Sequence, residues 1–323
     1  MERKRPRAHR LRGLSVLLKR GHCAPAVMET ILKAGGREDA GLVKLVAGLP
    51  GGIGDTGYEC GGITSPLVLL GLGAGPDAGR DGLPLVVARS QVHMRRFVSR
   101  HATLFCREIR GDKMRLWPCI KAILDSPGIY AAAAADGDGE ALPGARPDGS
   151  AAAGWEERRE AHALLAAGLA DSGFHCAHAV LDRLPSLESA YPELRAGTAA
   201  FLGGTALSAL TCSALTAGIM ILGRRLAEIE SSYLRVLRMI VLMKTGGDAF
   251  ADRINAFNFT MNLGNRVAQW FTAEFGGTQC RGITGTDFST PAGVRRFLDG
   301  GLAPCEKIAR KVAAKVESIL NEA

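Results

Sequence analysis

Residues 201–223 read FLGGTALSALTCSALTAGIMILG, and most of this stretch has a counterpart earlier in the chain. The segment 51–71 aligns on 203–223 without a gap and shares with it a Gly-Gly pair, a cysteine, a threonine and a final Leu-Gly pair. The identical positions are Gly51/Gly203, Gly52/Gly204, Cys60/Cys212, Thr64/Thr216, Leu70/Leu222 and Gly71/Gly223. This match indicates an internal repeat.

Three further motifs recur in the same order around other cysteines: HCAPAV (22–27) and HCAHAV (175–180), C-R-x-I-x-G (106–111 and 280–285), and P-C-x-K (118–121 and 304–307). The eight cysteines therefore form two sets of four, which are Cys23, Cys60, Cys106 and Cys119, and Cys176, Cys212, Cys280 and Cys305. Four motifs in one order argue against chance. A repeat this long predicts two tandem copies of one domain and not a solenoid.

We divide the chain into a basic N-terminal arm (1–20), a first four-cysteine module (21–130), a linker (131–158) and a second four-cysteine module (159–323). The linker is assigned because Ala, Gly, Asp and Pro dominate its sequence and large apolar residues are almost absent, so it can bury little surface. Apolar residues recur at helical spacing in 23–33, 176–184, 226–244 and 308–320. These patterns predict an all-α protein.

The charge of the chain is concentrated at one end. The 323 residues include 40 Lys+Arg and 32 Asp+Glu, a formal charge of +8. Residues 1–20 contain eight Lys or Arg and one Glu, so this arm supplies seven of those charges and the remainder is nearly neutral. We interpret the arm as either a solvated tail or a contact for an anionic partner. Aromatic residues, at 6%, are too few for a stacking platform on single-stranded nucleic acid, and there is no clear nucleic-acid signal.

One uncharged stretch bears on localisation. Residues 198–223 carry no charge and are long enough for the ~20 residues that cross a bilayer. They are rich in Gly, Ala, Ser and Thr, however, which favours a close-packed internal helix over a membrane span. The N-terminal residues lack the apolar region and cleavage site of a secretory signal. We therefore expect a cytoplasmic protein with reduced cysteines, whose roles are metal or redox chemistry.

The four-cysteine arrangement resembles the C_GCAxxG_C_C family, which is named for its four cysteines and is regarded as redox-active. The resemblance covers most of both modules and is strongest at 201–223, where a Gly-Gly pair precedes the cysteine by eight residues. It implies a helical domain that uses its cysteines for redox chemistry with a bound iron-sulfur cluster and a redox partner protein. Covalent haem attachment is not supported, since the chain contains no Cys-x-x-Cys-His.

All eight cysteines are candidate metal ligands. Four thiolates can hold an iron-sulfur cluster or one tetrahedral zinc ion, provided that the fold brings them together. Structural zinc usually uses tight Cys-x-x-Cys pairs, and none occurs here, so zinc is the less favoured metal. We therefore predict a redox-active protein with one iron-sulfur cluster per module, for electron transfer or redox sensing.

Two other functions remain open. In the first, the cysteines handle dithiol, disulfide or persulfide sulfur without metal, which requires accessible thiolates of lowered pKa. In the second, the protein is a zinc-stabilised helical adaptor whose basic arm binds an anionic partner. The insertion near 224–247 in the second module could form a partner surface or a homo-oligomer contact. The sequence does not establish whether the protein is itself an enzyme.

The neighbours of the cysteines each have two interpretations. The glycines either let the backbone approach a cofactor or permit turns with positive φ; they are Gly51, Gly52, Gly203 and Gly204. His22 and His175 could act at the cysteines in three ways: by donating a hydrogen bond to sulfur, by replacing a thiolate ligand, or by lowering the thiol pKa as imidazolium ions. The alternative is that both are cap or core residues.

Arginine, threonine and proline motifs complete the candidates. Arg107 and Arg281 either raise the reduction potential of an anionic cluster or form surface salt bridges. Thr64 and Thr216 bond either the sulfur or the preceding helical turn. The pair at 65–66, Ser-Pro, predicts an N-cap and first helical residue, which sets Cys60 just ahead of a helix N-terminus, where the dipole favours a thiolate.

Overall fold

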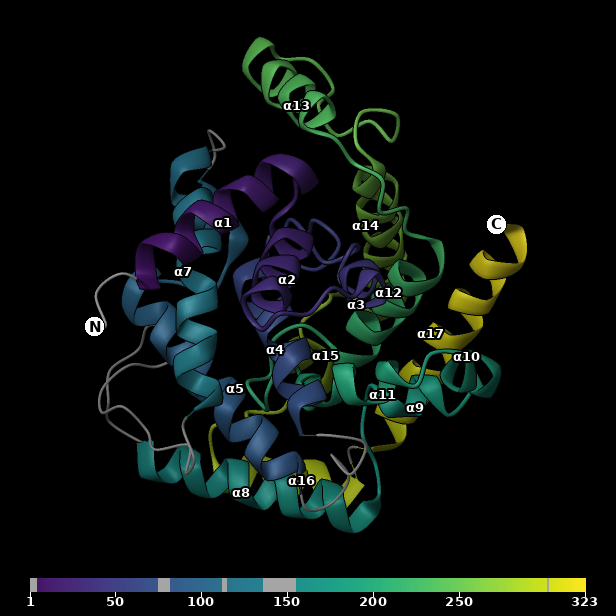
Figure 1. The fold of residues 1–323 in the computed structure, drawn as a ribbon. Helices are drawn as coiled ribbons and strands as arrows, with labels where there is room; N and C mark the ends of the chain where they lie inside the picture. Colours follow the sequence, from purple (N-terminus) through teal and green to yellow (C-terminus); the bar gives the residue numbers. More distant parts are fainter. Residues whose placement is uncertain (1–4, 75–81, 112–114, 136–154, 301) are drawn as a thin grey trace.

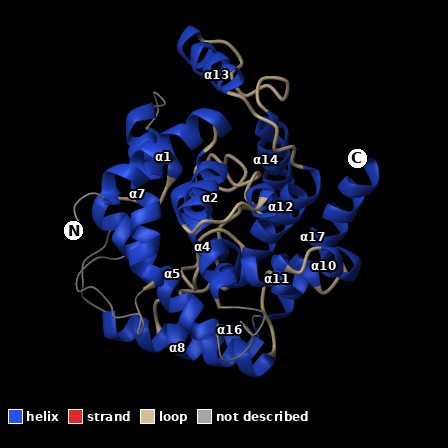
Figure 2. Cartoon of the chain, viewed as in Figure 1, coloured by secondary structure: helices blue, strands red, loops and turns tan. Residues whose placement is uncertain are grey.

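The computed structural model describes residues 5–74, 82–111, 115–135, 155–300 and 302–323. The prediction of an all-α protein is confirmed: the described residues form seventeen α-helices and one 3-10 helix and contain no strand (Figures 1 and 2). The first half contains α1 (Arg5–Arg20), α2 (Cys23–Ala34), α3 (Ala40–Leu45), α4 (Gly61–Gly73), α5 (Leu83–His101), α6 (Cys106–Arg110) and α7 (Leu116–Ala134).

The second half contains α8 (Trp155–Ser172), α9 (His178–Leu181), α10 (Pro185–Ala190), α11 (Glu193–Thr198), the 3-10 helix η1 (Ala199–Phe201), α12 (Ser213–Leu226), α13 (Tyr233–Thr245), α14 (Ala256–Phe275), α15 (Cys280–Thr284), α16 (Pro291–Gly300) and α17 (Leu302–Glu322). The repeated motifs place α2, α4, α6 and α7 in correspondence with α9, α12, α15 and α17. Helices α13 and α16 have no counterpart among the described residues of the first half.

The two copies share one hydrophobic core, in which α4 and α12 are the central helices. Each packs closely on the other copy through a glycine of the repeat. A Cβ atom at Gly71 in α4 would lie 2.2 Å from the carbonyl oxygen of Ala196 in α11, and one at Gly223 in α12 would lie 2.8 Å from that of Lys44 in α3. The identity of Gly71 and Gly223 therefore reflects close contact between the copies.

The predicted start of the helix at Ser65-Pro66 is wrong. Helix α4 begins at Gly61, immediately after Cys60, and α12 begins at the same position of the second copy, after Cys212. The sulfur of Cys60 accepts a hydrogen bond from the amide of Gly62 at 3.4 Å. The conclusion drawn from the predicted start, that Cys60 precedes a helix N-terminus, is nevertheless confirmed.

Pro66 is tolerated inside α4 because other donors satisfy the carbonyl group that it leaves free. A proline has no N–H, so the carbonyl of Gly62, four residues earlier, loses its helical partner. The His93 side chain donates to this oxygen at 3.0 Å and the Ser126 hydroxyl donates at 2.7 Å. Donors from α5 and α7 thus override the usual preference of proline for the first helical turn.

Several other expectations are corrected. Residues 5–20 of the basic arm form α1, which packs on α2, α7 and α13, so this described part of the arm is not a free tail. Residues 131–134 of the predicted linker extend α7 and 155–158 begin α8, as expected for Ala-rich and Glu-rich sequence; residues 136–154 lie outside the described part.

The uncharged stretch 198–223 is buried but is not one helix, because its middle forms a left-handed loop before α12. Helix α9 is shorter than the predicted 176–184, and residues 227–232 interrupt the predicted helix 226–244. Within the described ranges, no helix is both long and apolar enough to cross a membrane.

Candidate metal centres

The cysteines of both copies lie at the beginnings of helices. Cys23 and Cys106 are the first residues of α2 and α6, Cys60 caps α4, and Cys119 lies in the first turn of α7. In the second copy, Cys212, Cys280 and Cys305 occupy the same places in α12, α15 and α17, and Cys176 precedes α9. The unpaired amide groups and positive dipole at helix N-termini favour negatively charged sulfur.

Each set of four gathers around one space, although its members are widely separated in the chain. Cys176, Cys212, Cys280 and Cys305 all line a small cavity of about 10 Å³. Cys23, Cys106 and Cys119 line a larger cavity of about 180 Å³, and Cys60 is near enough to interact electrostatically with all three. All eight are free thiols. Among the described residues, no three His, Cys, Asp or Glu side chains are arranged to hold a single metal ion.

Burial controls the protonation of these thiols. It raises the pKa of all eight, to about 11 for Cys119 and about 12 for Cys212. After burial, the charges of neighbouring cysteines raise the pKa of Cys60 and Cys280 further. The thiols are therefore protonated at neutral pH unless a cation supplies the compensating charge, as a coordinated metal does.

A left-handed loop precedes the second cysteine in each copy. Positive φ angles occur at equivalent positions, which are Gly51/Gly203, Gly52/Gly204, Ile53/Thr205, Gly54/Ala206, Asp55/Leu207 and Gly57/Ala209. For a non-glycine residue this conformation costs roughly 1–2 kcal/mol. Matching backbone hydrogen bonds hold both loops, for example from the amide of Gly54 to the carbonyl of Gly48 (3.0 Å) and from that of Ala206 to Ala200 (2.9 Å). Backbone strain of this kind is typical of functional sites.

The loops bring backbone amides to the first cysteine of each set. The amide of Gly51 hydrogen-bonds the sulfur of Cys23 and that of Gly203 bonds the sulfur of Cys176, which partly offsets the effect of burial on the two pKa values. In the second copy the side chain of Ser213 also bonds Cys176. Gly51 and Gly203 therefore allow backbone to approach the candidate ligands.

Gly52 and Gly204 serve close packing. A Cβ atom at Gly52 would lie 2.4 Å from the backbone nitrogen of Tyr58, and one at Gly204 would lie 2.7 Å from the Cβ of Cys280. Both glycines also have positive φ. The role of both glycines is to permit the turn. In the second copy, Cys280 packs directly against Gly204.

The two histidines next to the first cysteines are core and cap residues. His22 donates from Nε2 to the Oδ1 of Asn258 at 2.6 Å, and burial lowers its pKa to about 4. His175 donates to the carbonyl of Ala199 at 3.1 Å and accepts from the amide of Ala177 at 3.2 Å, and burial lowers its pKa well below the usual value. Both rings are neutral at pH 7, so neither acts on its cysteine as an imidazolium ion.

Arg107 and Arg281 point to other partners. The guanidinium group of Arg107 lies over the Tyr58 ring, 4.9 Å from its centroid. Arg281 is exposed and pairs with Asp287 at 3.7 Å. Arg281 thus forms the surface salt bridge of the second interpretation, whereas the contact given by Arg107 is with an aromatic ring.

The two threonines differ from each other. The Thr216 hydroxyl donates to the carbonyl of Cys212 at 3.3 Å, which is the helical-turn alternative. The Thr64 hydroxyl is buried and has no hydrogen-bond partner among the described residues.

Sequence reasoning missed a charged pair beside the first cysteine set. Arg110 donates to Asp55 at 3.0 Å, and both line the cavity that contains Cys23, Cys106 and Cys119. Burial dominates the pKa of Cys106 and Cys119, and the charge of Arg110 opposes that increase. The equivalent residues of the second copy are Leu207 and Thr284, so a comparison of charged positions between the repeats could have revealed the pair.

A buried carboxylate joins the two sets. Glu59, which precedes Cys60, is fully buried and accepts hydrogen bonds from the hydroxyl of Thr205 (2.8 Å) and from the amide (3.0 Å) and hydroxyl (2.5 Å) of Thr211. Thr211 precedes Cys212 and occupies the position of Glu59 in the second copy. The backbone segments that carry the second cysteines of the two sets are therefore bonded to each other across the interface.

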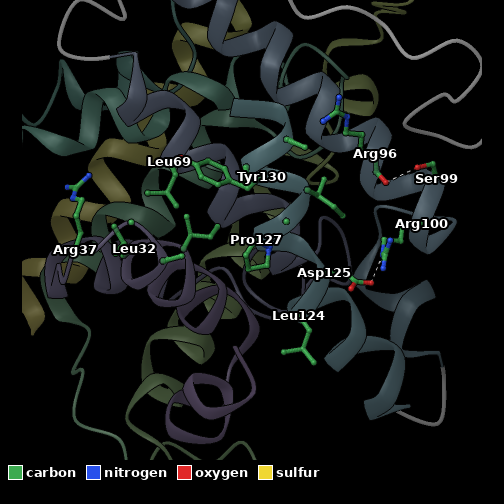
Figure 3. A pocket seen from close by; sticks show the side chains of 17 residues that line it. Leu32, Arg37, Leu69, Arg96, Ser99, Arg100, Leu124, Asp125, Pro127 and Tyr130 are labelled. Carbon is green, nitrogen blue, oxygen red and sulfur yellow. Dashed lines mark hydrogen bonds and ion pairs between the residues drawn. The ribbon is translucent and has the colours of Figure 1, made fainter. Parts of the chain in front are cut away.

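A larger cavity lies elsewhere among the described residues. It measures about 900 Å³ and is lined by residues of α2, α5 and α7, including Leu32, Arg96 and Tyr130 (Figure 3). The pair between Arg100 and Asp125 lies at one side of it. No cysteine lines it, so the size of a cavity does not by itself identify the cavities beside the cysteine sets.

Comparison with known proteins identifies one family. A family model described as "Putative redox-active protein (C_GCAxxG_C_C)" matches residues 21–132 and 174–319. Each match contains one complete cysteine set, and together they cover most of the chain. No curated protein and no solved structure matches the chain.

Proposed function

The chain belongs to the C_GCAxxG_C_C family, and from this premise we propose that each of its two cysteine sets holds one iron-sulfur cluster. The observation that carries the proposal is the gathering of each cysteine set at equivalent helix starts in both copies: all four cysteines of the second set line one cavity, and three of the first set line another, with Cys60 close enough to interact electrostatically with them. The protein would then transfer electrons or sense redox state in the cytosol together with a redox partner protein.

The wide spacing of the cysteines along the chain favours a cluster over a zinc ion. With Zn–S bonds of about 2.3 Å, tetrahedral zinc needs sulfurs about 3.8 Å apart. Structural zinc usually uses tight Cys-x-x-Cys pairs, and the sequence contains none. A cluster contains several iron and sulfide ions, so it joins thiolates that lie farther apart. When bound, it supplies one-electron chemistry.

The chain contributes ligands, charge stabilisation and exclusion of water. The donor set is chemically suitable, since cysteine thiolate is the usual ligand of iron-sulfur clusters. Helix starts and the amides of Gly51, Gly62 and Gly203 direct positive dipoles at the sulfurs, which stabilises negative charge. Hydrogen bonds to sulfur and the low solvent exposure of the thiols both set the reduction potential of such a centre.

Thiol chemistry without metal receives less support. Exchange and persulfide transfer need accessible thiolates of lowered pKa. Burial instead raises the pKa of every cysteine in the chain. Five of the eight are buried, with at most 9% of their surface exposed: Cys60, Cys106, Cys176, Cys212 and Cys280. Buried thiols of raised pKa suit permanent ligands better than exchanging nucleophiles.

The test is anaerobic reconstitution of the full chain with iron and sulfide. We expect broad visible absorption and, after reduction, a paramagnetic signal. Cys212→Ser should remove the contribution of the second set, whereas Ser208→Ala, which changes a nearby hydroxyl outside the sets, should leave it intact. A protein that stays colourless and free of iron after reconstitution would overturn the proposal.

A further inference from the structure

The two cysteine sets differ in the space beside them. The cavity of the second set measures about 10 Å³, whereas the cavity that reaches Cys23, Cys106 and Cys119 measures about 180 Å³. The larger cavity extends away from the sulfurs, and Cys60 does not line it. The first set therefore adjoins a space that the second set lacks.

Helices outside the repeated cysteine motifs contribute part of the wall of this space, and α7 contributes another part. Leu17 and Leu18 of α1 and Val236, Met239 and Met243 of α13 line it. Helix α13 belongs to the insertion of the second copy and packs beside α1 (Figure 1). An element of the second copy thus covers the cysteines of the first.

The chemistry of the walls selects an uncharged ligand. Except at the sulfur end, the lining is apolar, and its three methionines (Met239, Met243 and Met261) can adapt to irregular shapes. At the sulfur end, Arg110 and Asp55 are paired with each other, so neither offers an uncompensated charge to a ligand. Burying an ion against such walls without a partner is costly.

We propose that this cavity is a binding site for a small, uncharged, apolar molecule next to the first cysteine set. An apolar cavity of roughly 150 Å³ is known to bind benzene or xenon, and the space of about 180 Å³ is of that size in the metal-free chain; in the reconstituted chain the ligand takes the part of it that lies away from the cysteines. The proposal deepens the proposed function and rests on it for one consequence: such a molecule reaches the first cluster and not the second.

Xenon is the probe. Xenon NMR on the full chain, both metal-free and reconstituted with iron and sulfide, should show one saturable binding site in each form. Met239→Trp fills the cavity from a buried position and should abolish the binding. Val241→Trp places the same side chain on the exposed side of α13 and should leave it unchanged. If circular dichroism shows that Met239→Trp does not fold, Met243→Phe fills the cavity with a smaller side chain.

Two results would overturn the proposal. One is the absence of saturable binding, or binding that survives a folded cavity-filling variant. The other is binding by the metal-free chain alone, which would mean that the cluster itself occupies the cavity. If reconstitution yields no cluster, the proposed function fails, while the metal-free measurement still tests for the site.

Discussion

Replacing Glu59 with alanine removes three hydrogen bonds that join the two copies. The carboxylate is fully buried and accepts from the hydroxyl of Thr205 and from the amide and hydroxyl of Thr211. Each hydrogen bond to a charged group contributes about 1.5–3 kcal/mol, and the three are not additive because they share one acceptor group. Three buried donors would remain unpaired, so we expect the free energy of unfolding to fall by about 3–5 kcal/mol.

The assay is urea unfolding of the metal-free chain under reducing conditions, followed by circular dichroism. Glu59→Gln keeps the volume and one acceptor oxygen, so it should cost only about 1–2 kcal/mol. Thr205→Val removes one donor, and combining it with Glu59→Ala in a double-mutant cycle should show a coupling of about 1–2 kcal/mol. A Glu59→Ala protein within about 1 kcal/mol of the wild type would refute the claim that this carboxylate holds the copies together.

Three further predictions concern the loop, the charged pair and a buried histidine. In urea unfolding, Gly51→Ala should destabilise the chain by about 1–3 kcal/mol more than Gly36→Ala. Both glycines have positive φ, but only at Gly51 would an added Cβ atom collide with the backbone, 2.7 Å from the Cα of Asp55. Equal effects of the two substitutions would contradict this explanation. Arg110→Thr should lower the reduction potential of a cluster held by the first set by on the order of tens of millivolts in a redox titration, and Thr284→Arg should raise the potential of one held by the second set. Unchanged potentials would argue against an effect of the arginine charge. Burial lowers the pKa of His93 from 6.5 to about 4, so the unfolded chain binds a proton at this residue that the folded chain does not. The contribution of His93 to stability should therefore fall by up to about 3 kcal/mol as pH decreases from 6.5 to 4, and the other buried histidines of lowered pKa add to the loss. Unfolding of His93→Gln should depend less on pH in that window, and an unchanged slope would show that another group is responsible.

The features that could be predicted from the sequence are those that depend on pattern. Helical periodicity and the repeated cysteine motifs indicate the all-α fold and its two copies without knowledge of tertiary contacts. The same alignment finds Gly71 and Gly223, although only the structure shows that each packs on the backbone of the other copy.

The features that could not be predicted depend on how the copies pack. Pro66 suggests a helix start locally, but donors from α5 and α7 satisfy the carbonyl group that it leaves free, so the helix begins earlier. Glu59 meets Thr211 only because equivalent segments face each other across the interface. Thr205 and Leu207 adopt left-handed backbone conformations that their residue types normally avoid, so nothing in the sequence indicates these conformations.

The most direct test of the central claim is the amount of iron and acid-labile sulfide per chain after anaerobic reconstitution. Two equivalent cysteine sets predict that Cys119→Ser and Cys305→Ser each lower the iron content of the wild type toward half, and that the double variant loses most of it. Iron content that is unaffected by both substitutions, or a wild-type chain without iron and labile sulfide, would contradict the account.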